Sequence, residues 1–97
     1  MIGGTDMPNE HTDVRVLIVD DQASFRRAAR SVVELTPGFA MVGEAETGEA
    51  SVAAADLGPD LVLIDVHLPG VDGLEASRRI LSADSGPRPV VFLLSTP

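Results

Sequence analysis

Four short, mostly apolar segments divide this 97-residue sequence at regular intervals, and segments of helical periodicity separate them. Apolar runs rich in Val, Ile and Leu are typical of parallel strands that are covered on both faces. The alternation with short loops predicts an α/β fold, a doubly wound parallel sheet of about four strands and three helices. The predicted strands are residues 14–19, 39–45, 60–66 and 90–95.

Three helices are predicted between these strands: residues 22–36, residues 47–58 and a segment that begins after Asp72. Thr47 and Asp72 are candidate N-caps, and Gly58 is a candidate helix end. In the first helix, apolar residues recur at helical spacing, and we expect the charged residues opposite them to form a solvated face rather than a docking site. The apolar set is Phe25, Ala28, Ala29, Val32 and Val33, and the charged set is Arg26, Arg27, Arg30 and Glu34.

Composition excludes several classes of protein. The net charge of −8 argues against binding of nucleic acid by this segment, since such binding depends on basic side chains that contact phosphates. There is no cysteine for a disulfide or a thiolate metal site, and no apolar run approaches the length of a membrane span. Residues 1–12 are polar and aperiodic, which predicts a disordered tail before a domain at 13–97. We expect a soluble, cytoplasmic domain without membrane contact.

Acidic residues stand where two of the predicted strands end. Asp20 and Asp21 follow the first strand, Asp65 lies at the end of the third, and Ser95 and Thr96 end the fourth. In parallel sheets of this kind, ligands bind beyond the carboxyl ends of the strands. Carboxylates ~4 Å apart repel by about 4 kcal/mol at an effective dielectric constant of 20, so a cluster of them requires a cation. Oxygen ligands of this kind favour Mg²⁺.

Each acid taken singly also has a plain structural explanation. Asp20 or Asp21 could cap the following helix, and Asp65 could be a solvated residue at a strand end. No glycine-rich phosphate-binding loop follows any of the strands. The position of all three acids at one edge of the sheet favours a functional site.

Three motifs resemble the receiver domain of bacterial two-component response regulators, over residues 14–96. They are "LIVDDQ" at the first strand, "AETGEA" after the second and "PDLVLIDVHLPGVDGLE" around the third. The last motif places Asp65, Pro69, Asp72 and Gly73 at the family's spacing. The segment "RVLIVDDQASFRRAARSVVE" is most similar to regulators with a LuxR/NarL-type DNA-binding output domain. The resemblance implies a flavodoxin-like fold with strand order 2-1-3-4-5.

The resemblance also implies a chemistry. Asp65 would accept a phosphoryl group from a sensor histidine kinase. Asp20, Asp21, Asp65 and the His67 backbone carbonyl would bind Mg²⁺. Ser95, thirty positions after Asp65, would be the switch hydroxyl, with Thr96 as the alternative. The His67 side chain would either modulate the lifetime of the phosphoryl group or simply face solvent.

One family feature is missing from the sequence. The family holds the phosphoryl group with a lysine at the end of a fifth strand, and this chain contains no lysine and ends at Pro97. We therefore expect a truncated receiver that lacks the fourth helix, fifth strand and fifth helix. Two alternatives are a homodimer that covers the exposed edge of the fourth strand, and a degenerate receiver kept for protein binding.

The function expected from these observations is a phosphoryl-accepting switch rather than a metabolic enzyme. It would control an output domain that lies outside this chain, and the resemblance to the LuxR/NarL type implies that this output is transcription. The first alternative is a phosphorylation-independent binding or dimerisation module. The second is an Mg²⁺-dependent phosphohydrolase with an aspartate nucleophile, which the missing lysine and the "DDQ" motif disfavour.

Overall fold

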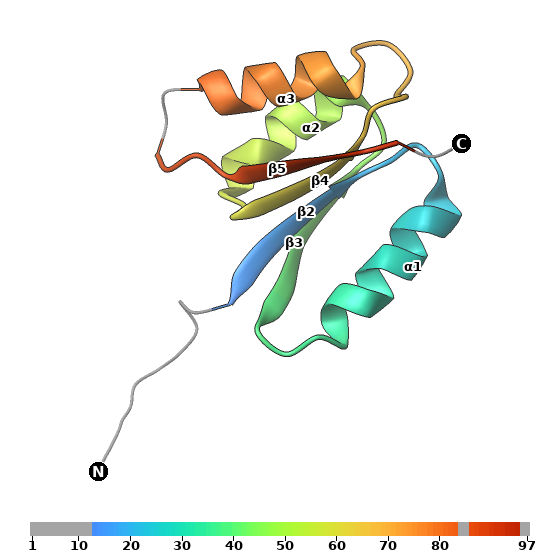
Figure 1. Ribbon diagram of the computed structural model, residues 1–97, viewed down its shortest axis with the longest axis vertical. Coiled ribbons are helices and arrows are strands. Elements are labelled where there is room, and N and C mark those ends of the chain that lie inside the picture. The colour runs from blue at the N-terminus through green and yellow to red at the C-terminus, as the bar shows by residue number, and fades with distance from the viewer. Residues whose placement is uncertain (1–12, 84–85, 96–97) are drawn as a thin grey trace.

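The computed structural model describes residues 13–83 and 86–95 of the chain. The predicted alternation of strands and helices is present (Figure 1). The elements in chain order are β2 (Val14–Val19), α1 (Ala23–Glu34), β3 (Phe39–Ala45), α2 (Gly48–Ala54), the 3₁₀ turn η1 (Ala55–Leu57), β4 (Leu61–Asp65), α3 (Gly73–Ser82) and β5 (Val90–Leu94).

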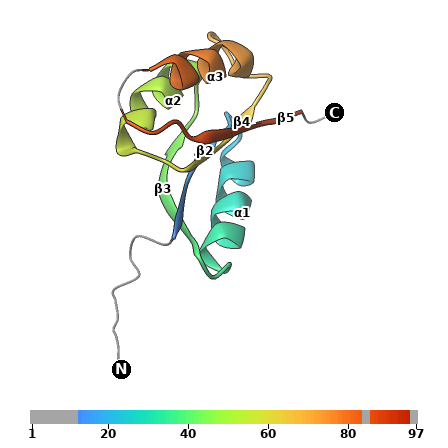
Figure 2. The same cartoon turned by 60° about the vertical axis from the view of Figure 1, so that its left-hand side comes forward.

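The four strands form one parallel sheet in the order β3-β2-β4-β5. This order confirms the predicted fold class, a flavodoxin-like sheet with four strands and three helices. Helix α1 covers one face of the sheet, and α2 and α3 lie together on the other face (Figures 1 and 2). In this strand order β2 is interior, with β3 on one side and β4 on the other. Its carboxyl end therefore lies between the ends of two neighbouring strands.

The core has two parts because successive side chains of a strand point to opposite faces of the sheet. Leu17 and Val19 of β2 belong to the cluster that includes Ala76 and Ile80 of α3. Val16 and Ile18 belong to the cluster on the α1 side, with Val33. These four side chains of β2 are all buried, which explains why this part of the strand is a continuous apolar run.

The helix caps predicted for α2 and α3 are confirmed. The Thr47 hydroxyl accepts a hydrogen bond from the Ala50 N–H at 3.0 Å, and the Asp72 carboxylate accepts one from the Glu75 N–H at 2.9 Å. Gly58 ends η1 with φ of 71°, a conformation that favours glycine. These caps fix where the loops after β3 and β4 give way to helix.

The expected inward face of α1 is partly wrong. Phe25, Ala29 and Val33 pack against the sheet, whereas Ala28 is exposed and Val32 is 64% exposed. Residues four apart lie on one face of a helix, and here only the row that contains Phe25, Ala29 and Val33 faces the sheet. The neighbouring row, with Ala28 and Val32, faces solvent.

The solvated face expected for the arginines of α1 also requires correction. Arg26 and Arg30 both form ion pairs with Glu44 of β3. Residues four apart lie on the same side of a helix, so both guanidinium groups reach the same carboxylate. Arg27, between them, remains exposed as expected.

Strand β5 is an outer strand of the sheet, hydrogen-bonded to β4. Its apolar side chains are only partly covered, and Val90, Phe92 and Leu93 are exposed. No helix in the part of the chain that the structure describes is long and apolar enough to cross a membrane. The predicted tail at 1–12 and the candidate Thr96 lie outside the described residues.

Candidate functional site

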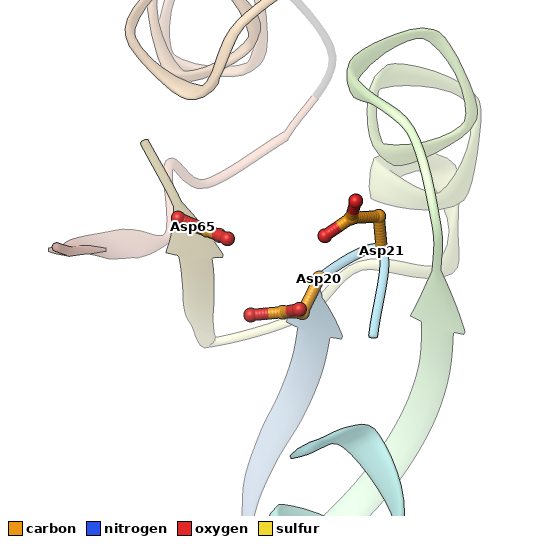
Figure 3. A group of neighbouring side chains, drawn as sticks. All are labelled: Asp20, Asp21 and Asp65. Atoms are coloured by element: carbon orange, nitrogen blue, oxygen red, sulfur yellow. The ribbon is translucent and has the colours of Figure 1, made fainter. Parts of the chain in front are cut away.

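Three carboxylates meet at the carboxyl edge of the sheet, as the sequence predicts (Figure 3). Asp20 follows the last residue of β2, Asp21 comes next, and Asp65 is the last residue of β4. One carboxylate oxygen from each residue lies within 4.8 Å of the others. Asp20 and Asp65 are only 4% and 5% exposed, whereas Asp21 is exposed. Two carboxylates of the cluster are therefore buried, and the cluster is open to solvent at Asp21.

The two buried carboxylates are oriented by the backbone that follows them. The Gln22 N–H donates to Asp20 Oδ1 at 2.8 Å, and the His67 N–H donates to Asp65 Oδ1 at 2.9 Å. Both bonds join a carboxylate to the amide two residues later, which is the Asx-turn pattern. Each bond engages Oδ1, and among the described residues no backbone N–H donates to Oδ2 of either carboxylate.

The alternative that Asp20 or Asp21 caps the next helix is wrong. The N-cap of α1 is Gln22, and no side chain makes the capping hydrogen bond. Asp20 bonds to the amide of the N-cap residue itself, which precedes the helix. The two acids therefore have no capping role that would account for them.

The electrostatics of the cluster favour a bound cation. Burial raises the pKa of the Asp20 carboxyl above its ordinary value, and the nearby charges of Asp65 and Asp21 raise that pKa further, against the opposing effect of the Gln22 N–H. A neighbouring cation would relieve both the desolvation and the repulsion. The donors are all carboxylate oxygens, two of them held in place, and this set fits Mg²⁺.

The loop after β4 is held close to the site by two glycines. A Cβ on Gly73 would lie 2.2 Å from the Asp65 carbonyl oxygen, and a Cβ on Gly48 would lie 2.1 Å from the Val71 carbonyl oxygen. The Gly73 N–H also donates to the Val66 carbonyl at 3.1 Å. Only glycine permits these approaches. The sequence motif contains Gly73, but its contact with the backbone of Asp65 emerges only from the fold.

Arg26 is a neighbour of the site that sequence reasoning missed. Its Nη1 donates to the main-chain carbonyl of Asp20 at 2.7 Å, and its Nε contacts Glu44 at 3.2 Å. Its position on the helix predicts only an exposed cation, because the partner carbonyl belongs to a loop whose path depends on the fold.

The side chains of the remaining described candidates, Ser95 and His67, are both exposed. The Val66 N–H donates to the Leu94 carbonyl at 2.9 Å, so the end of β5 lies beside the end of β4, and Ser95 follows it with an exposed side chain. Within residues 13–83 and 86–95, no hydrogen bond joins Ser95 to the three acids. The His67 side chain is exposed.

A parallel α/β sheet with a carboxylate cluster at its carboxyl edge is an arrangement that could hold a metal ion. Comparison with known families makes this specific: residues 16–96 match the response regulator receiver domain. The chain belongs to this family.

Curated relatives agree with this assignment. Over 83 residues the chain is 41% identical to a protein-glutamate methylesterase/protein-glutamine glutaminase of Alkalilimnicola ehrlichii, covering 84% of this chain and 21% of the relative. Over 81 residues it is 35% identical to the nitrate/nitrite response regulator protein NarL of Escherichia coli K12, covering 82% of this chain and 38% of NarL. The chain thus spans between a fifth and two fifths of these relatives, and the activities in their names are those of the relatives.

A solved structure confirms the fold. The chain is similar to the response regulator domain of Thermotoga maritima CheB, with a TM-score of 0.78 and 32% identity. The match covers 86% of this chain and 60% of that domain. The likeness therefore extends over most of this chain.

Proposed function

We propose that this receiver domain is a phosphoryl-accepting signalling switch in which Asp65 is the acceptor. The observation that carries the proposal is the convergence of Asp65 with Asp20 and Asp21 at one sheet edge. A carboxylate can attack phosphorus when the negative charge of the phosphoryl group is neutralised and the carboxylate is held in position. Asp65 meets the second condition through its hydrogen bond to the His67 N–H.

In the proposed reaction, a carboxylate oxygen of Asp65 forms a bond to phosphorus while the bond between phosphorus and the donor's imidazole nitrogen breaks. The product is an aspartyl phosphate, and the donor histidine regains a neutral imidazole after proton uptake. Since Oδ1 accepts the His67 N–H, Oδ2 is the oxygen left to attack. Asp20 and Asp21, with Asp65, would hold Mg²⁺, which neutralises charge on the transferring group when bound.

Three further residues have proposed roles in the switch. Ser95 would contact the phosphoryl oxygens through its hydroxyl, with Thr96 as the alternative if Ser95 does not. His67 would contribute its backbone carbonyl to the metal, and its exposed side chain would face the phosphoryl group and modulate its lifetime. The position of Ser95 directly after the strand that pairs with β4 supports its role.

The proposed phosphoryl donor is a sensor histidine kinase. A solved complex of the P1 domain of CheA3 with CheY6 from R. sphaeroides is similar to this chain, with 30% identity and a TM-score of 0.71 over 87% of this chain and 64% of that one. The proposed output is transcriptional control through a domain outside this segment, in the cytoplasm, in keeping with the similarity to NarL.

Intact mass spectrometry after incubation with acetyl phosphate and Mg²⁺ tests the proposed function. We expect one phosphoryl group on the wild-type chain and none on Asp65→Asn. Asp65→Asn should keep its far-UV circular dichroism, because asparagine retains the oxygen that accepts the His67 N–H. Equal loading of both proteins, or of neither, would contradict the assignment of Asp65.

A second candidate function is a phosphorylation-independent binding module that pairs with a second copy of itself. The observation that favours it is the outer strand β5, with Val90, Phe92 and Leu93 exposed beside a backbone edge. Apolar outer strands pair readily with other strands. The two functions are compatible, since the acids and β5's outer edge are separate features of the sheet.

A further inference from the structure

We propose that Arg26 is a positioning residue for the metal site, acting through the backbone of Asp20. This inference rests on the proposed function, because it concerns how tightly the same three acids hold Mg²⁺. Arg26 does not contact the carboxylates themselves. Its guanidinium donates to the main-chain carbonyl of Asp20 at 2.7 Å.

Three hydrogen bonds hold the main-chain groups and Oδ1 of Asp20, and Arg26 supplies the one of these that comes from a side chain. The Asp20 N–H donates to the Ala45 carbonyl at 3.0 Å, and Asp20 Oδ1 accepts the Gln22 N–H at 2.8 Å. The bond from Arg26 fixes the third polar group, the main-chain carbonyl. This arrangement secures the residue while leaving Asp20 Oδ2 available to a cation.

Arg26 is itself held in place. Its Nε contacts Glu44 Oε1 at 3.2 Å, and the other oxygen of Glu44 accepts from Arg30 Nε at 2.6 Å. Glu44 lies on β3, paired with Ile18 of the neighbouring strand β2. The Arg26 side chain is 14% exposed, compared with 46% for Arg30. A chain of polar contacts therefore runs from β3 through Arg26 to the acid-bearing loop.

Groups that orient the ligands of a metal affect its affinity, and their loss typically costs about 10- to 100-fold. Simple Coulomb interaction predicts the opposite sign for Arg26. Removing a positive charge beside three carboxylates should strengthen the binding of Mg²⁺. The positioning role and the charge effect thus predict opposite changes, which makes the inference sharply testable.

Arg30 supplies a matched control. Arg26→Gln and Arg30→Gln each remove one positive charge and one ion pair with Glu44, but only Arg26 contacts Asp20. The chain contains no Trp or Tyr, so Mg²⁺ binding is best followed through backbone amide signals in NMR spectra. The titration is run well below the melting temperature of each variant, so that only folded protein is observed.

We expect Arg26→Gln to raise the Mg²⁺ dissociation constant by roughly tenfold and Arg30→Gln to leave it within about twofold of wild type. Arg26→Lys, which keeps a donor for the Asp20 carbonyl, should fall between wild type and Arg26→Gln, and it serves as the test if the Gln variant does not fold. Without metal, hydrogen exchange at the Gln22 amide should be faster in Arg26→Gln than in Arg30→Gln.

Binding by the folded Arg26 variants as tight as wild type, or equal losses in the Arg26 and Arg30 variants, would overturn the inference. The wild-type titration separates this result from a failure of the proposed function. If wild type does not bind Mg²⁺ at millimolar concentration, the metal site itself is wrong. If wild type binds and the Arg26 variants bind equally well, only the role of Arg26 is wrong.

Discussion

At the scale of a single residue, Asp20 shows how a side chain suited to binding a metal can lower the stability of the metal-free protein. Its carboxyl is 4% exposed and lies next to two other acids, and burial and these neighbours raise its pKa. A raised pKa in the folded state means that the ionised form is less favourable there than in the unfolded chain. Without metal, Asp20 therefore lowers the free energy of unfolding at neutral pH.

Asp20→Asn should raise the melting temperature of the metal-free protein at pH 7 by a few degrees, because asparagine removes the charge and keeps the oxygen that accepts the Gln22 N–H. The difference from wild type should shrink as pH falls, since Asp20 is then protonated in both states of the wild type. Thermal melts in EDTA check this between about pH 4, close to the ordinary pKa of an aspartate, and about pH 7.

The same variant should lose most of the thermal stabilisation that Mg²⁺ gives to wild type, since a ligand stabilises only the state that binds it. Melts at equal ionic strength with NaCl in place of MgCl₂ separate metal binding from screening. A variant that melts below wild type without metal, or that still responds fully to Mg²⁺, would contradict the assigned role of Asp20.

At the scale of elements, the sequence predicts the strands and caps well and the contacts between elements poorly. The apolar run of β2 and the side chains of Thr47 and Asp72 carry local signals, so their structure follows from nearby residues. The partners of Arg26 and the close approach at Gly73 depend on how a loop and a helix pack. No local pattern encodes such packing.

Gly73→Ala tests the packing of the loop after β4. Its Cβ would lie 2.2 Å from the Asp65 carbonyl oxygen, a backbone atom that cannot rotate away, so the backbone carrying Asp65 must shift. We expect a loss of about 2 kcal/mol or more in the free energy of unfolding and a marked loss of phosphoryl loading.

Gly43→Ala is the matched control for that variant. Its Cβ would meet Leu57 Cδ1 at 2.9 Å, the end of a side chain that can move. Chemical denaturation should therefore show a smaller loss, and loading of the folded protein should be retained. Equal losses from the two substitutions would contradict the special role of the contact between Gly73 and Asp65.

At the scale of the whole molecule, β5 is an outer strand of the sheet (Figure 1), and its side chains Val90, Phe92 and Leu93 are exposed. If a second copy pairs with β5, sedimentation velocity should show association that increases with concentration. Phe92→Lys places a charge on this strand and should shift the protein toward the monomer. A monomer at all concentrations for both proteins would remove the second candidate function.

The order of the strands is the property of the whole molecule that sequence reasoning predicts best. Alternating apolar runs and helices favour a parallel sheet, and the family resemblance supplies the order, which brings Asp20 and Asp65 together. The same reasoning does not show whether Ser95 reaches the acids, because the position of a hydroxyl at a strand end depends on side-chain contacts beyond the strand pattern.

Mapping the phosphoryl group to one residue is the most direct test of Asp65 as the acceptor. Trypsin cleaves after arginine, which places Asp20 and Asp21 in peptide 16–26 and Asp65 in peptide 31–78. Borohydride reduces an aspartyl phosphate to homoserine, so tandem mass spectrometry of the loaded and reduced protein identifies the acceptor. We predict homoserine at residue 65 alone. Homoserine at Asp20, at Asp21 or at another acid of peptide 31–78 would contradict the account.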